Sequence, residues 1–446
     1  MSTVLILTFL ILLILDVPVA FCMLLSSLAA LLYHGIDPIM VGLETTRSLT
    51  SFYSFLAVPF FILAGELMNQ GGLSTRLIRF VKALIGHHRS GLPAVTSISS
   101  QMFGAVSGAS AATCAAVGGI MIPALEKKGY SRAFATALAA CSGTTGALIP
   151  PSILLIIYGT LANVSIEKLF MGGLLPGVLV GLGLILMSGP ITRKMNIPKE
   201  TKANFKEIKE SAMGAIFSVF LVVIIFAGII GGVFTATEAS AVAVMYAALV
   251  GFLVYRELKI RDLPAILLAA VRTTASLSFL IACAMLFAWT LSIGKMPELF
   301  ASGLVDFCDR LIGFFTTDLS PDMLALIRRI LVLMILNLML LFFGMFIDAG
   351  PGLIIVVPVA LPISAAIGMD AGLAAIHFGV LVVSNMIIGL VTPPVGSTLF
   401  VASAVGNVSI AQMTPYLMRF LLVMIIVQLL ITYYAPIITF LPSLIS

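Results

Sequence analysis

Long apolar runs, interrupted by short charged segments, dominate the chain. A run of about 20 apolar residues is long enough to cross a lipid bilayer as a helix. The pattern predicts a first membrane span that is bent at Pro18, and six further continuous spans. We place the seven spans at about residues 3–33, 48–70, 168–192, 211–233, 238–255, 265–293 and 420–441.

Two other apolar runs each predict a helical hairpin. Ser90–Leu125 carries no charge, exceeds one span and is too short for two spans with a loop. Basic residues flank both of its ends, which the positive-inside rule places in the cytoplasm. We therefore expect a re-entrant hairpin with its tip near Ser107–Thr113. Ile330–Met369, with FFGMFIDAGPG at its centre, repeats this pattern.

Two matched proline pairs predict two broken membrane helices. GALIPP, residues 146–151, interrupts the uncharged run Ala133–Ile166, and GLVTPP, residues 389–394, interrupts Ala371–Met418. Consecutive prolines remove backbone donors and force the chain out of the helix. Irregular backbone at membrane depth is tolerated only where protein or a water-filled cavity satisfies it.

The two breaks belong to an internal repeat. The Pro–Pro pairs and the glycines that precede them have the same spacing along the chain, and Asn163–Ile166 and Asn407–Ile410 both read NVSI. A hairpin precedes each break. An odd number of spans between the halves would invert the second relative to the first, as in inverted-repeat transporters.

Composition agrees with a polytopic, all-α membrane protein. The 446 residues are 61% hydrophobic and 10% charged, which excludes a soluble globular protein. The net charge of +5 arises from basic segments such as 76–89 and 193–209, which we expect in the cytoplasm. The first of these suits an amphipathic surface helix, and the more acidic segment 295–322 suits a second one on the outer side. No dense basic run indicates nucleic-acid binding.

The breaks and hairpin tips are the candidate site. A broken helix exposes carbonyl oxygens without donors, and such oxygens, with hydroxyls, suit a hard cation such as Na⁺. Half-helix ends at the tips would bind an anionic substrate without a buried arginine. The alternative is that these small polar residues only permit close helix packing. The candidate cation ligands are Ser107, Ser110, Gly146, Ile149 and Pro151 in the first half, and Asp348, Gly350, Gly389, Thr392 and Pro394 in the second. The candidate substrate-binding residues are Ser107, Gly108, Thr113, Thr145, Gly396 and Thr398.

Four ionisable residues have two interpretations each. Asp348 suits a cation site or a helix N-cap. Glu66 and Glu238 suit helix caps or interfacial positions, or else a gating or coupling role. His377 suits a packed, hydrogen-bonded side chain or a proton relay.

An enzyme is the weaker hypothesis. Ser110 would need a base within hydrogen-bond reach to act as a nucleophile, and the sequence places none of the four histidines there. No HExxH, Walker A or nucleophile-elbow motif is present. A stand-alone divalent-anion/Na⁺ symporter, a cation/proton antiporter and a pure scaffold subunit stay open.

Five segments together resemble the large membrane subunit of tripartite ATP-independent periplasmic (TRAP) transporters. The segments are PFFILAGELM (59–68), SGASAATCAAVGGIMIPAL (107–125), SGTTGALIPPS (142–152), GVFTATEASAVAV (232–244) and GLVTPPVG (389–396). The resemblance implies a Na⁺-driven, elevator-type carrier in the bacterial inner membrane. It implies two separate partners, a small four-helix membrane subunit and a soluble periplasmic binding protein. It also implies that the substrate is an organic acid, such as a C4-dicarboxylate or sialic acid, that at least two Na⁺ ions act as coupling ions, and that no organic cofactor is needed.

An elevator divides the chain into a moving transport domain and a scaffold. We expect the transport domain at residues 93–166 and 323–411, each holding one hairpin and one broken helix. The scaffold would then comprise residues 1–92, 167–322 and 412–446.

Overall fold

The computed structural model describes the whole chain except residues 51–52, 89, 196, 198–202, 316–319 and 445–446. The described residues fold as α-helices with short 3-10 and π segments, and no strand occurs among them. Eight helices within the described ranges are long and apolar enough to cross a membrane. An all-helical membrane protein is therefore confirmed.

The helices fall into four consecutive groups. The first comprises α1 (Ser2–Ile14), α2 (Val19–Tyr33), α3 (Pro38–Thr50), α4 (Ala57–Gln70) and α5 (Leu73–Ile85). The second comprises α6 (Gly91–Ser107), α7 (Ser110–Lys127), α8 (Arg132–Gly146), α9 (Ile153–Ala162) and α10 (Ile166–Arg193). The third comprises α11 (Phe205–Ile230), α12 (Ala236–Leu249), α13 (Leu263–Ile293) and α14 (Met296–Phe315). The fourth comprises α15 (Pro321–Phe346), α16 (Ala349–Ala366), α17 (Gly372–Gly389), α18 (Ser397–Gly406), α19 (Ile410–Tyr433) and α20 (Pro436–Thr439).

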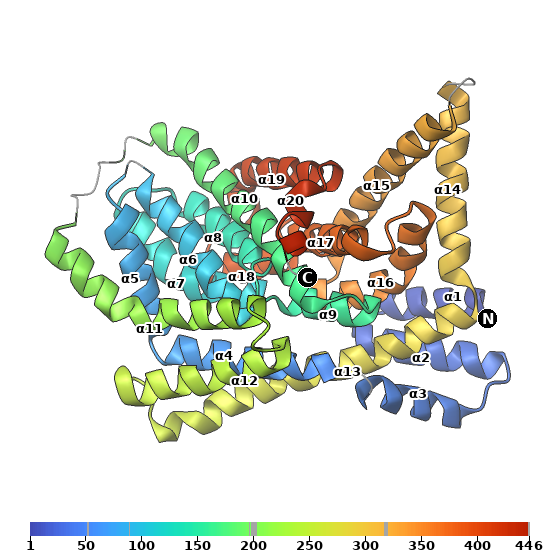
Figure 1. Ribbon diagram of the computed structural model, residues 1–446, viewed down its shortest axis with the longest axis horizontal. Helices are drawn as coiled ribbons and strands as arrows, with labels where there is room; N and C mark the ends of the chain where they lie inside the picture. Colours follow the sequence, from blue (N-terminus) through green and yellow to red (C-terminus); the bar gives the residue numbers. More distant parts are fainter. Residues whose placement is uncertain (51–52, 89, 196, 198–202, 316–319, 445–446) are drawn as a thin grey trace.

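The first predicted span is two helices rather than one bent helix. Asp16 takes φ +60°, and the N–H groups of Asp16 and Val17 bond to the carbonyls of Leu13 and Leu12. This pattern is a Schellman motif, which ends α1 with a residue in the left-handed conformation. Pro18 then precedes α2, which packs back against α1 (Figure 1). The prediction of a single span over residues 3–33 is wrong, because Asp16 reverses the chain.

The outer body of the molecule consists of α2, α3, α4, α11, α12 and α13, which pack on one another. The surface helices α5 and α14 lie at opposite ends of it, across the direction of α12 and α13 (Figure 1). A cluster fixes α5 to this body: Arg76 forms an ion pair of 2.6 Å with Glu257 and lies over the ring of Tyr255. The Tyr255 hydroxyl donates to the Gly214 carbonyl of α11 at 2.6 Å.

The surface helix predicted over residues 295–322 is α14, which ends at Phe315. The next helix, α15, begins at Pro321, before the predicted start of the second hairpin. Ser320 caps α15 by accepting a hydrogen bond from the N–H of Met323 at 3.3 Å, and Pro321 occupies the first helical turn. Arg328 is accommodated within α15 because its guanidinium donates to both carboxylate oxygens of Asp309 on α14, at 2.7 and 2.9 Å. The second hairpin therefore starts nine residues before the predicted Ile330.

Helices α6–α10 and α15–α19 form two matched halves that run in opposite directions. Arg132, which begins α8, donates from Nε to the carbonyl of Gly406, which ends α18, at 2.6 Å. Tyr158 of α9 contacts Gly379 in the earlier part of α17. The two broken helices therefore lie antiparallel. The second hairpin helix of each half packs against the broken helix of the other half, α7 on α18 and α16 on α9. This antiparallel packing is what an inverted repeat would produce.

Candidate functional site

The tip of the first hairpin is a tight turn between α6 and α7. Gly108 takes φ +62°, a conformation that favours glycine. The Ser107 and Thr113 hydroxyls are 2.9 Å apart, and Thr113 donates to the Ala109 carbonyl at 2.9 Å. These bonds hold the tip in shape. The Ser110 hydroxyl is buried and has no hydrogen-bond partner among the described residues.

This tip lies directly on the first break. A Cβ atom on Gly104 of α6 would lie 2.3 Å from the Cα of Gly146 at the end of α8. Side chains are therefore excluded from both positions, and the two backbones touch. A Cβ atom on Gly108 would lie 2.7 Å from the Ile153 side chain at the start of α9. The hairpin thus contacts both sides of GALIPP.

The first break leaves carbonyl oxygens unpaired. The N–H of Ile149 bonds to the Gly146 carbonyl at 3.3 Å, which closes the last turn of α8. Ser152 then caps α9 by accepting from the N–H of Leu155 at 3.3 Å. Within the described part of the chain, no group donates to the carbonyl oxygens of Ile149 or Pro151. The Pro150–Pro151 bond is cis.

The second half repeats this arrangement. A Cβ atom on Gly389 would lie 2.5 Å from the backbone of Gly344 on α15. The N–H of Thr392 bonds to the Gly389 carbonyl at 2.9 Å. Among the described residues, none donates to the carbonyl oxygens of Thr392 or Pro394. The Pro393–Pro394 bond is cis, as in the first break.

Asp348 connects the second tip to the second break. It occupies the N-cap position of α16, but its side chain makes no capping bond. Its carboxylate instead accepts a hydrogen bond from the Ser397 hydroxyl, at the start of α18, at 2.8 Å. The Gly396 N–H adds a bond to the Met345 carbonyl at 2.8 Å. Asp348 is therefore the N-cap residue by position, as one interpretation expected, although its carboxylate binds Ser397 rather than the helix; its role in a cation site stays a prediction.

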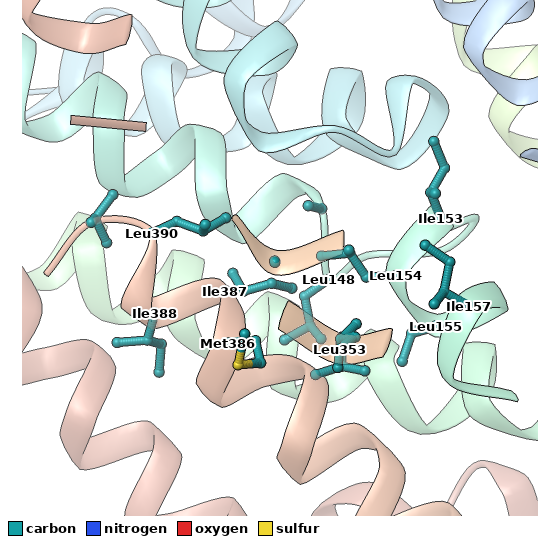
Figure 2. Packing of buried hydrophobic residues seen from close by; sticks show 14 of the residues in the cluster. Leu148, Ile153, Leu154, Leu155, Ile157, Leu353, Met386, Ile387, Ile388 and Leu390 are labelled. Carbon is teal, nitrogen blue, oxygen red and sulfur yellow. The ribbon is translucent and has the colours of Figure 1, made fainter. Parts of the chain in front are cut away.

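Both tips and the second break meet at one cavity of about 110 Å³. The first turn of α7 and the first turn of α16 form part of its wall, so two helix N-termini lie beside it. Its lining residues are Gly108–Ala111, Ile153, Leu154, Ile157, Leu277, Asp348–Gly350 and Leu390. Figure 2 shows Leu390 of the second break in the same cluster of buried side chains as Leu148 of the first break and Leu154 of α9.

The predicted cation ligands fit the chemistry of a hard cation. Within the described chain, the carbonyl oxygens of Ile149, Pro151, Thr392 and Pro394 accept no hydrogen bond, whereas those of Gly146 and Gly389 each accept one N–H. The first tip adds the Ser110 hydroxyl, which has no partner among the described residues. Oxygen donors of this kind are those that hard cations prefer. Among the described residues, no three His, Cys, Asp or Glu side chains are grouped so that they could hold a metal ion.

The predicted substrate residues divide into two sets. Gly108 lines the cavity. Thr113 holds the tip, and the Thr145 hydroxyl bonds to the Cys141 and Ser142 carbonyls of its own helix, at 2.8 and 3.0 Å. Thr398 is fully buried with an unpartnered hydroxyl, and Gly396 is a turn residue. In the described chain, the predicted substrate residues that do not line the cavity are Ser107, Thr113, Thr145, Gly396 and Thr398.

The NVSI repeats follow each broken helix and form matching turns. Asn163 and Asn407 take φ +53° and +47° and end α9 and α18 in the left-handed conformation. Ser165 and Ser409 then cap α10 and α19, accepting N–H groups at 3.2 and 3.4 Å. The repeated sequence therefore encodes a helix end and a helix start rather than ligands.

The remaining ionisable residues lie away from the cavity lining. Glu238 forms a capping box with Thr235, whose N–H donates to the Glu238 carboxylate at 2.8 Å. The His377 Nε2 bonds to the Ile431 carbonyl at 2.7 Å, the packed arrangement. Glu66 is half-buried on α4, beside Gly65, where a Cβ atom would lie 3.1 Å from the Cα of Ser107.

Sequence reasoning missed three features. Gly104 and Gly344 pack against the breaks, and the Phe-Gly pair that both hairpins contain is the pattern that predicts them. Leu277, a cavity residue of α13, lies in an ordinary apolar span. The third feature is a buried polar network in the second half, recognisable as amides within apolar runs. It comprises Asn337, Ser384, Asn385, Gln428 and Thr432.

Fold and site together define a class of membrane carrier with two inverted halves and paired broken helices. Residues 6–437 match the family described as tripartite ATP-independent periplasmic transporter, DctM component. The chain belongs to this family and is a large permease subunit rather than an enzyme.

Named relatives have different substrates. The chain is 36% identical to the C4-dicarboxylate TRAP transporter large permease protein DctM of Vibrio cholerae, covering 97% of this chain and 95% of that protein. It is 34% identical to the sialic acid TRAP transporter large permease protein SiaM of the same organism, covering 96% and 95%. The Alcanivorax borkumensis YdaH transporter shares the fold, with a TM-score of 0.59 at 14% identity, covering 88% of each chain.

Proposed function

We propose that this permease subunit carries out Na⁺-coupled uptake of a carboxylate-bearing organic acid by an elevator movement. The observation that carries the proposal is the convergence of both hairpin tips and the second break on one cavity, which the Ser110 hydroxyl and the Asp348 carboxylate line. The relatives support it, since named members are permeases for a C4-dicarboxylate and for sialic acid.

The first Na⁺ would bind Ser107, Ser110, Gly146, Ile149 and Pro151, and the second would bind Asp348, Gly350, Gly389, Thr392 and Pro394. The unpaired carbonyls at Ile149, Pro151, Thr392 and Pro394 support this assignment. The substrate carboxylate would lie against the N-termini of α7 and α16, where N–H groups and helix dipoles favour an anion. Binding of Na⁺ at the tips would fix these N-termini, and the coupling is then a binding linkage.

The moving unit should comprise both halves entirely, including α10 and α19. Gln101 of α6 donates to the Gly177 carbonyl of α10 at 2.9 Å, and Gln428 of α19 donates to Asn337 of α15 at 3.1 Å. Buried bonds of this kind would have to break if α10 and α19 stayed behind. We therefore transfer these two helices from the expected scaffold to the transport domain. The scaffold would be α1–α5 and α11–α14.

The family context supplies the partners and the location. We propose that a small four-helix membrane subunit binds the scaffold and that a soluble periplasmic protein delivers the acid. The complex would work in the bacterial inner membrane, with the basic helix α5 on the cytoplasmic side.

Uptake into proteoliposomes tests the function. The permease, its small subunit and its binding protein would be reconstituted together, and uptake of labelled acids would be followed with Na⁺ or K⁺ outside. Uptake should require the inward Na⁺ gradient. Undiminished uptake with K⁺ alone would refute Na⁺ coupling, and no uptake of any organic acid would refute the transport function.

A further inference from the structure

The wall of the cavity between the hairpin tips is mostly apolar. Ile153, Leu154 and Ile157 form one side on α9, Leu390 comes from the second break, and Leu277 comes from α13. The α9 side chains and Leu390 are all at least 90% buried. Figure 2 shows the three α9 side chains spread along one turn of that helix.

Groups that bind an anion lie at one place only, the hairpin tips. The first turns of α7 and α16 both reach the cavity, and the buried Ser110 hydroxyl on α7 has no hydrogen-bond partner. Ser110 and Asp348 are the two lining residues with polar side chains, and no Lys or Arg lines the cavity in the described chain. One carboxylate therefore finds donors, whereas a second carboxylate or a row of hydroxyls finds none.

We propose that this chain selects acids with a single carboxylate and a short apolar tail, in preference to dicarboxylates and polyhydroxylated sugar acids. The inference rests on the proposed function and names its substrate class. The carboxylate lies at the two helix N-termini with Ser110, and the tail contacts Ile153, Ile157, Leu277 and Leu390.

The physical reason is the cost of burying unpaired polar groups. A buried polar or charged group without a hydrogen-bond partner loses its hydration and gains nothing in return. A succinate ion would place its second carboxylate against leucine and isoleucine side chains. Each methylene of an apolar tail should instead strengthen binding about fourfold when it is buried.

The soluble partner also selects substrate, so the test uses the two membrane subunits without it. The shift of the thermal unfolding midpoint in saturating Na⁺ would be measured with acetate, propionate, butyrate, isovalerate, succinate and gluconate. Affinity should rise steadily from acetate to isovalerate. It should be at least about tenfold weaker for succinate and gluconate than for isovalerate.

Two variants assign the effect to the cavity. Leu277→Ala should weaken isovalerate binding several-fold and leave acetate binding unchanged, because only the longer tail reaches α13. The matched control is Leu268→Ala on the same helix, where Leu268 is 51% exposed on the outside of the molecule and should affect neither ligand. Ser110→Ala should weaken the whole series by one common factor.

The outcomes separate the two proposals. If succinate or gluconate binds more tightly than isovalerate, or if affinity does not depend on tail length, the apolar-acid inference is wrong while the transport function stands. If no organic acid shifts the midpoint in Na⁺ and none is taken up by the complete transporter, the proposed function is wrong as well.

Discussion

The first hairpin and its broken helix are joined by small residues, whereas the second pair is joined additionally by hydrogen-bonding side chains. In the first half, Gly104 meets Gly146, and the buried hydroxyls of Ser99, Ser100 and Ser142 have no partners in the part of the chain that the structure describes. In the second half, Gly344 meets Gly389 in the same way. The second half adds the amide network of Asn337, Asn385 and Gln428.

The two hairpin tips also differ in their side-chain hydrogen bonds. The first tip closes on itself through Ser107 and Thr113, whereas the second is linked to its break by the Asp348–Ser397 bond. Both halves therefore have a glycine–glycine backbone contact, which holds each hairpin against its broken helix. The side chains around it differ and set how firmly each half is held.

We expect the largest loss of uptake from substitutions at the glycine contacts that both halves share. Gly104→Ala and Gly389→Ala each place a methyl group within 2.5 Å of backbone atoms, so the tip and the break must separate. Each variant should reduce uptake by the reconstituted transporter more than about tenfold. Gly119→Ala on α7, which meets open space, is the control and should retain full uptake. Normal uptake by both variants would show that tip–break contact is dispensable.

A smaller effect should distinguish the halves. Asn385 and Ser142 occupy equivalent positions in α17 and α8, but only Asn385 has a partner. Asn385→Ala should lower the free energy of unfolding by about 1–2 kcal/mol, because it leaves Asn337 with one bond fewer. Ser142→Ala should change it by less than about 0.5 kcal/mol. Both free energies would be measured by unfolding in detergent. Equal losses for Asn385→Ala and Ser142→Ala would show that the hydrogen bonds of the second half do not make it more stable than the first.

The tips should differ in their Na⁺ dependence. Asp348→Asn removes a negative charge from the second tip and should raise the Na⁺ concentration for half-maximal uptake about tenfold. Ser397→Ala removes only the hydrogen bond that orients Asp348 and should have a smaller effect in the same direction. An unchanged Na⁺ concentration in Asp348→Asn would exclude Asp348 from the cation site.

The smallest effects should be equal in the two halves. Asn163→Ala and Asn407→Ala each force alanine into the left-handed conformation that ends a broken helix. Each should cost about 1 kcal/mol of unfolding free energy. Asn163→Gly and Asn407→Gly are the controls and should be close to neutral, since glycine adopts this conformation freely. A large difference between the two alanine variants would show that the matching turns are not equivalent.

Most helix positions could be predicted from the sequence, because prolines end helices and charged segments separate membrane spans through local effects. GALIPP and GLVTPP end helices wherever they occur, and the charged segments separate the spans, so α8–α13 lie close to their predicted positions. The turn at Asp16 could not be predicted, because a single aspartate within an apolar run does not indicate that its backbone is left-handed. The charge of Arg328 placed the predicted start of the second hairpin too late in the chain. The sequence did not show that Arg328 is paired with Asp309 on another helix.

The site was only partly predictable for a related reason. Residues at the tips and breaks are recognisable from the repeat, and of the predicted residues Gly108, Ser110, Asp348 and Gly350 line the cavity. Leu277 and the α9 side chains line the cavity only because distant helices meet there, and an apolar residue in an apolar span carries no mark of that position. Thr145 illustrates the converse, because a polar residue beside a break turns its hydroxyl back to its own helix.

The central claim is that carbonyls and hydroxyls at the tips and breaks bind Na⁺, and it can be tested without knowing the substrate. The thermal unfolding midpoint of the purified complex of the two membrane subunits would be measured during titration with NaCl or KCl at constant ionic strength. A ligand that binds only the folded protein raises the midpoint. The account predicts a saturable rise with Na⁺ but not with K⁺, shifted to higher Na⁺ concentration in Ser110→Ala and in Asp348→Asn. Equal midpoints in Na⁺ and K⁺ would contradict it.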